Sequence, residues 1–325
     1  MTHKKSPFNI AMLLDGKGGA RDLSDEEVAA WSASDGILWI DIDFENKQGT
    51  RWLSKGSNLD KNSASILLAG ETRPRSLSGT DGLLVILRGI NMNPGAVPDD
   101  MIAVRVSLQS SRVITSRRRK ILSINDLREA LLAGNGPKSV GGFLISLNGF
   151  LSERIEAAVE NIEQVISDLD DRMTGGDIES IRGALGVVRR QAAAIRRHLA
   201  PQRDAIDQIA RSGAEILSEK DIFRLREEGD QLTRHIEDLD LARENALVTQ
   251  EELMNRVALE QNSRMYLLSI VAAIFLPLTF VTGLLGMNVA GLPGTENPKG
   301  FVYSAVIMVI CLIALIAYFR HRKWI

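Results

Sequence analysis

The sequence predicts an α/β domain, followed by long stalk helices and then by two C-terminal transmembrane helices. Three observations carry this prediction. Roughly the first 120 residues alternate short apolar runs with turn signals. After Gly142 the residue pattern is typical of helix throughout. Two long uncharged apolar runs lie near the C-terminus. A chain of 325 residues is long enough for a soluble part and a membrane part.

The overall composition excludes some classes of protein. The chain is 45% apolar and 25% charged with a formal net charge of −2, so no strongly basic nucleic-acid binder is indicated. Cys311 is the only cysteine, which excludes an internal disulfide. Nucleophile, base and cofactor-binding patterns do not emerge, so neither an enzyme nor a bound cofactor is predicted.

Short strands and helices are expected in the first part of the chain. The expected strands are Gly36–Phe44, Gly82–Ile90, Met101–Leu108 and Arg112–Thr115, the last pairing back on the third. Ser24 and Glu27 have the spacing of a capping box before a short helix. A further helix is expected from near Ser123 to the glycine turn at Gly134.

Three long helices are expected next. They cover Phe143–Met173, Asp177–Arg211 and Ser218–Leu285, separated by glycine-containing breaks. Pro201 should kink the second helix or mark a turn in it. The third is far longer than an ordinary globular helix, and its charged half runs directly into an apolar half. It therefore has the character of a stalk that enters a membrane.

The two uncharged runs, Met265–Leu285 and Phe301–Phe319, are each about 20 residues long, which is enough to cross a bilayer. Basic residues flank them on one side: Arg256, Arg264, Arg320, Arg322 and Lys323. The intervening loop has only Lys299, opposed by Glu296. The positive-inside rule therefore places both termini in the cytoplasm. The predicted division is 1–140 α/β domain, 141–264 helical stalk region, 265–285 first span, 286–300 external loop, 301–319 second span and 320–325 basic tail.

Gly286-Met287-Asn288 follows the first span. Two spans cannot enclose a pore, so a transporter of this design needs several copies around an axis. In such a ring, Asn288 presents amide oxygens to a cation that keeps some or all of its water. Taken alone, the tripeptide is more typical of a helix C-cap. A cytosolic sensor that two membrane spans anchor is therefore an alternative to a transporter.

The position of this tripeptide resembles the signature of the CorA-type cation transporters. Phe275–Phe280 is similar to that family's first span, and the segments 288–294 and 321–325 resemble its ZntB branch. Further similar segments are Leu38–Asp41, Ala69–Arg75 and Ala200–Asp204, so the resemblance covers nearly the whole chain.

The resemblance implies a homopentamer with a cytosolic funnel, a pore-lining first span and a lipid-facing second span. It further implies a multi-pass protein of the bacterial inner membrane, with a periplasmic loop, that transports Zn²⁺. ZntB-like sequences often carry Val where this chain has Met287, which leaves Mg²⁺, Co²⁺, Ni²⁺ or Cd²⁺ as alternatives. Lipid, divalent cations and further copies of the chain are the expected partners.

Helical spacing gives the residues that would face the axis. Stepping back from Asn288 by threes and fours gives a mostly apolar stripe, and the family match selects from it Thr279, Leu276, Leu268, Met265 and Asn262. Packing between subunits is the alternative role for the apolar members.

The sequence offers few other candidate metal ligands outside the pore face. The histidines are scattered and no zinc-ligand cluster appears, so zinc rests on the family branch alone. Glu251 and Glu252 on the stalk are candidates for cation sites between subunits, although such carboxylates are more often a solvated helix face.

Overall fold

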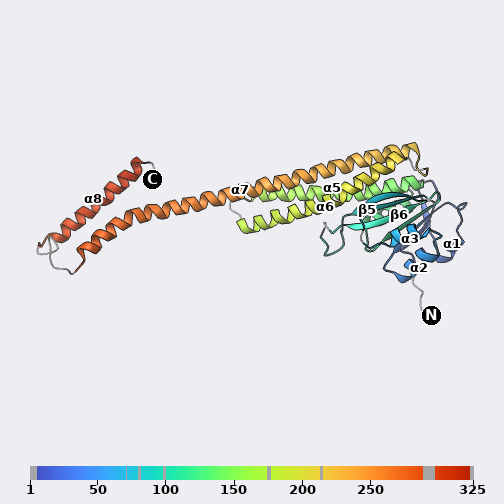
Figure 1. Cartoon of the computed structure of the whole chain (residues 1–325), viewed down its shortest axis with the longest axis horizontal. Helices are drawn as coiled ribbons and strands as arrows, with labels where there is room; N and C mark the ends of the chain where they lie inside the picture. The colour runs from blue at the N-terminus through green and yellow to red at the C-terminus, as the bar shows by residue number, and fades with distance from the viewer. Residues whose placement is uncertain are drawn as a thin grey trace. The chain divides into compact units, whose positions relative to one another are not determined.

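Figure 1 shows the computed structural model of the chain, which describes residues 6–70, 72–79, 82–97, 100–173, 177–212, 215–287 and 297–322. The chain divides into two compact units, Met1–Gln250 and Glu251–Ile325. The first unit contains a sheet and most of the helices, and the second contains the long apolar segments.

The described part of the first unit contains a seven-stranded sheet in the order β2-β1-β3-β7-β6-β5-β4. Its strands are β1 (Ile10–Leu14), β2 (Ala20–Asp22), β3 (Ile37–Asp43), β4 (Arg75–Gly79), β5 (Gly82–Gly89), β6 (Ile102–Leu108) and β7 (Arg112–Arg117). Neighbouring strands are antiparallel except β3 and β7, which run parallel. The four strands expected from the sequence are confirmed, including the pairing of β7 with β6.

Helices cover both faces of the sheet. On one face, α1 (Asp25–Ala30), α2 (Lys47–Lys55) and α3 (Lys61–Leu68) bury Val28, Leu53 and Leu67 against alternate residues of β3. The capping box at Ser24 and Glu27 is present at the start of α1. On the other face, the Trp39 ring packs edge-on against Phe143 of α5 (Val140–Asp171), with ring centroids 5.1 Å apart. The expected helix near Ser123 is α4 (Leu122–Leu132), which packs against α5.

Because helices cover both faces, Asp41 of β3 is buried, while Asp43 at the end of the strand is partly exposed. Asp41 is fully buried, with its Oδ2 atom 2.9 Å from Arg117 Nη2, and its Oδ1 atom accepts a hydrogen bond from the Thr115 hydroxyl at 2.8 Å. This pairing of a buried carboxylate with an arginine ties β3 to β7, and it satisfies charges that would be costly to bury alone.

Three long helices pack lengthwise in the first unit: α5, α6 (Ile178–Ser212) and the first part of α7 (Glu219–Leu285) (Figure 1). Their polar contacts include Asn148 Nδ2 to Glu228 Oε2 at 2.6 Å and Arg196 Nε to Asp240 Oδ1 at 2.6 Å. Pro201 was expected either to kink the second helix or to mark a turn, and the turn is wrong because α6 continues through Pro201. Buried neighbours such as Leu199 and Ile206 hold both sides of the proline in the helix.

The second unit contains the last part of α7 and the helix α8 (Gly300–His321). The sequence expectation of one helix from the stalk into the first apolar run is confirmed, because α7 is continuous for 67 residues. Residues 288–296, which separate the two helices, lie outside the described residues.

Candidate functional site

In the described residues, α7 and α8 are the two helices long and apolar enough to cross a membrane. Their apolar side chains are largely exposed within one chain. Leu276 is 75% exposed and Phe301 is 83% exposed. Exposed apolar surface of this extent requires lipid or further protein to cover it.

The predicted pore-lining residues all lie on α7. Asn262, Met265, Leu268, Leu276 and Thr279 are exposed. At about 100° per residue, these five positions fall within an arc of about 120° on the helix surface. Leu267 and Val271, on the opposite side by the same spacing, are exposed as well. The helical spacing, rather than exposure, therefore distinguishes the candidate pore face.

This face combines apolar and polar positions. Asn262 and Met265 border an open hollow that is also lined by Asn255, Ala258, Leu259 and Gln261. Leu268 and Leu276 are apolar, and Thr279 supplies a hydroxyl one turn from Leu276. Polar rings can hold a hydrated ion, while apolar rings constrict a pore by excluding water.

Thr279 lies two residues after Pro277, which is inside α7 and cannot donate an amide hydrogen to the Ala273 carbonyl. Its own carbonyl accepts a hydrogen bond from the Thr282 hydroxyl at 3.0 Å. A bond from the Thr279 hydroxyl back to the Phe275 carbonyl is not among the hydrogen bonds described for residues 215–287.

The signature tripeptide is described only in part. The amide of Gly286 donates to the Thr282 carbonyl at 2.9 Å and closes the last turn of α7. Gly286 is not among the glycines with positive φ, so a left-handed turn does not explain a glycine here. Met287 is 45% exposed. Asn288 lies outside the described residues.

The stalk carboxylates Glu251 and Glu252 are exposed. The Oε1 atom of Glu252 is 3.9 Å from Arg256 Nη2, one turn along the helix. No group of three or more His, Cys, Asp or Glu side chains that could hold a metal occurs among the described residues of the chain.

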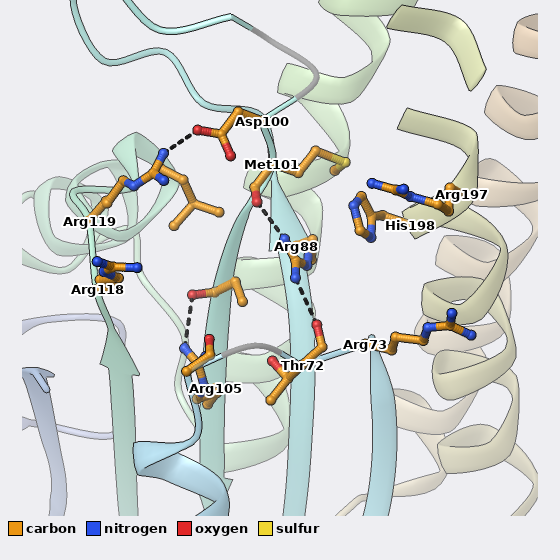
Figure 2. Close-up of a pocket in the computed structure, with 13 residues that line it drawn as sticks. Thr72, Arg73, Arg88, Asp100, Met101, Arg105, Arg118, Arg119, Arg197 and His198 are labelled. Atoms are coloured by element: carbon orange, nitrogen blue, oxygen red, sulfur yellow. Dashed lines mark hydrogen bonds and ion pairs between the residues drawn. The ribbon is translucent and has the colours of Figure 1, made fainter. Parts of the chain in front are cut away.

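The sequence analysis missed a cavity in the first unit. This cavity is lined by six arginines that belong to the sheet region and α6 (Figure 2). Its arginines come from separate parts of the chain, and Arg118 and Arg119 are the one adjacent pair among them.

Comparison with known proteins gives the family. Residues 34–322 match the model of the CorA family, described as CorA-like Mg²⁺ transporter protein. The divalent cation transporter CmaX of Pseudomonas aeruginosa is 35% identical over 316 residues, covering 96% of this chain and 95% of the relative. The zinc transport protein ZntB of Pectobacterium carotovorum is 34% identical over 316 residues, covering 97% and 95%.

A solved structure is similar to this chain over nearly its full length. The structure of the full-length CmaX protein matches with a TM-score of 0.84 at 34% identity, covering 98% of both chains. The family match, the two relatives and this structure extend across the sheet region, the long helices and the apolar helices. The chain belongs to the CorA family of transporter proteins.

Proposed function

We propose that the protein transports divalent cations, with Zn²⁺ as the principal substrate, through a pore on the axis of a homopentamer in the bacterial inner membrane. The observation that carries this proposal is the face of α7 that bears Asn262, Met265, Leu268, Leu276 and Thr279. This face lies on a helix long enough to cross a membrane, in a chain of the CorA family. Because each chain supplies only two such helices, several copies must surround the pore.

The proposed path begins at Asn288, whose amide oxygens form a ring at the external mouth. Neutral oxygens suit a cation that keeps its inner water, because removing water from a small divalent ion is costly. The ion then meets Thr279, the apolar rings of Leu276, Leu268 and Met265, and finally Asn262. The apolar rings serve as the gate, since a narrow apolar passage empties of water.

The orientation of the two spans in the membrane is proposed from the charged residues that flank them. Arg256 and Arg264 precede the first span, while Arg320 and Arg322 follow the second. These flanks favour a cytoplasmic location for both termini, with the 286–300 loop outside. The first unit then lies in the cytoplasm as the funnel.

Zn²⁺ is proposed ahead of Mg²⁺, Co²⁺, Ni²⁺ and Cd²⁺ because several relatives over nearly the full length are zinc transport proteins. CmaX, a relative of similar identity, carries the broader description of divalent cation transporter. A membrane-anchored cation sensor without transport is the second candidate, favoured only by the large first unit.

Reconstitution of the purified protein alone into liposomes tests the proposal. Each of the five metals is added outside, and its entry is followed with a trapped metal-sensitive dye, with and without a pH gradient. We expect protein-dependent entry that is fastest for Zn²⁺, compared with protein-free liposomes. Metal binding to the protein without entry of any of the five metals would instead identify a sensor.

A further inference from the structure

The helices α5 and α7 are joined by a polar contact inside the first unit. Asn148 of α5 is fully buried, and its Nδ2 atom donates a hydrogen bond of 2.6 Å to Oε2 of Glu228 on α7. The second carboxyl oxygen, Oε1, also lies against α5, since it is 3.8 Å from the position that a Cβ atom at Gly149 would occupy. The Glu228 carboxyl group is therefore set against two consecutive residues of α5.

The carboxamide of Asn148 has an unpaired acceptor. Its Oδ1 atom is buried and has no hydrogen-bond partner among the described residues. Ser152, one turn along α5, does not supply the missing donor, because its own buried hydroxyl has no partner there either. A buried acceptor without a donor is costly to a folded protein, so a donor that reaches Oδ1 stabilises the contact between α5 and α7.

The surroundings of Glu228 favour the neutral acid over the carboxylate. Burial is the main cause, and the negative charges of Glu227 on α7 and Glu153 on α5 act in the same direction. Together they raise the pKa of Glu228 above its ordinary value of 4.5, although the hydrogen bond from Asn148 opposes the rise. The proton is therefore held more tightly here than by an exposed glutamate.

The other charged groups close to Glu228 do not offset this repulsion. On α6, the carboxylate of Asp207 lies against Gly229, the next residue of α7. Arg224, one turn before Glu228 on α7, is exposed and does not pair with it in the part of the chain that the structure describes. Glu228 is therefore a partly buried acid that has acidic residues near it from all three long helices.

We infer that Glu228 and Asn148 form a proton-binding site that fastens α5 to α7. When Glu228 takes up a proton from the solvent, Oε1 carries the new hydrogen and donates it to Oδ1 of Asn148, while Oε2 still accepts from Nδ2. The carboxylic acid and the carboxamide then share two hydrogen bonds, and each group acts both as donor and as acceptor. Only the O–H bond of the acid is formed in this step.

The direction of the pH dependence follows from the raised pKa of Glu228. The folded protein binds this proton more tightly than the unfolded chain does. The contribution of the pair to stability is therefore complete below about pH 4.5 and is lost as the pH rises through the pKa of the folded protein. Above that pH the ionised carboxyl leaves Oδ1 of Asn148 without a donor, so the contact between α5 and α7 is weaker at neutral pH than in acid.

Glu228→Gln tests the inference in the full-length protein in detergent. Glutamine has the shape of the protonated acid and a permanent amide donor, so it can pair with Asn148 at every pH. We expect its unfolding temperature to exceed that of the wild type by about 2 °C or more at about pH 8. This gain should shrink towards about pH 5, because Glu228 of the wild type then takes up its proton. Glu237→Gln removes an exposed carboxylate from the same helix and is the matched control, with an expected change within about 1 °C.

Gly149→Ala gives a second test. The added methyl group lies in ordinary contact with Oε1 of Glu228 and removes more water from the carboxylate, so the pKa of Glu228 should rise further. When the wild type and Glu228→Gln both carry Gly149→Ala, the gain should therefore shrink at a higher pH than before.

Hydrogen exchange shows where the effect lies. At about pH 8, the peptides that contain Asn148 and Glu228 should exchange more slowly in Glu228→Gln than in the wild type, because the α5–α7 contact opens less often. A Glu228→Gln protein that is no more stable than the wild type at about pH 8 would overturn the inference, as would an equal gain at both pH values or an equal gain in Glu237→Gln. The result is independent of whether the protein transports cations.

Discussion

At the scale of single residues, Thr279 offers a test of the pore face. Its side chain lies on the proposed pore face, and its carbonyl accepts a hydrogen bond from the Thr282 hydroxyl. Thr279→Val keeps the shape of the side chain and removes the hydroxyl, whereas Thr279→Ser keeps the hydroxyl. We expect Val to reduce cation flux in liposomes and Ser largely to preserve it, with similar assembly. Loss of assembly in the Val variant, or equal flux in both, would place Thr279 in helix packing instead.

His198 predicts a pH dependence of stability. Burial and the charges of Arg88, Arg197 and Arg73 lower its pKa to about 4 in the folded protein. Because an unfolded histidine takes up a proton near pH 6.5, acid favours the unfolded state as the pH falls from about 6.5 towards 4. His198→Gln should therefore lose less thermal stability than the wild type between about pH 7.5 and about pH 5.

Thermal unfolding of both proteins at the two pH values measures this difference. His321→Gln is the matched control, because it removes an exposed histidine outside the cavity. An unchanged acid-induced loss in His198→Gln would show that the arginine cavity does not suppress protonation of His198.

At the scale of elements, α7 predicts different roles for two adjacent leucines. Leu268 lies on the proposed pore face and Leu267 on the opposite side, and they are 71% and 64% exposed in one chain. Leu268→Ser makes an apolar ring polar, so it should hydrate the constriction and increase cation leak. Leu267→Ser, the matched control, should leave the leak near the wild-type rate. Dye-loaded liposomes measure both, and equal leak would place the pore face elsewhere.

The long elements were predictable because their signals are local. The boundaries of α5, α6 and α7 follow from glycine breaks, and those of α8 from an uncharged apolar run. Three strands were missed for a physical reason: β2 has only three residues, β4 reads Arg-Ser-Leu-Ser-Gly, and β1 is a short apolar run without alternation. Their pairing with longer strands, rather than their own propensity, makes them strands.

The pore face and the arginine cavity differ in how far the sequence predicts them. The pore face was proposed from helical spacing on one element together with the family resemblance, which selected Met265, Leu268 and Thr279 from the stripe. The arginine cavity could not be predicted, because Arg73, Arg105 and Arg197 come from separate elements and meet only in the folded sheet and α6. Asp41 illustrates the same limit, since the fold buries its carboxylate against Arg117, which lies on another strand.

At the scale of the whole molecule, the proposed function requires a ring of copies. Two spans cannot enclose a pore, and the apolar side chains of α7 and α8 are exposed in one chain. We expect native mass spectrometry of the protein in mild detergent to give assemblies of five chains of 35.7 kDa each. A monodisperse monomer that still supports flux after reconstitution would contradict this prediction.

Transport through the proposed pore is tested by comparing Zn²⁺ entry through wild-type protein and through Asn288→Ala, in liposomes that contain equal amounts of assembled protein. Asn297→Ala removes an amide from another position of the 286–300 segment, which is exposed, and serves as the matched control. We expect Asn288→Ala to slow Zn²⁺ entry by about tenfold or more, because a ring of ion-binding oxygens is lost, and Asn297→Ala to stay near the wild-type rate. Entry through Asn288→Ala at the wild-type rate, with assembly intact, would contradict the proposed role of Asn288 at the mouth of the pore.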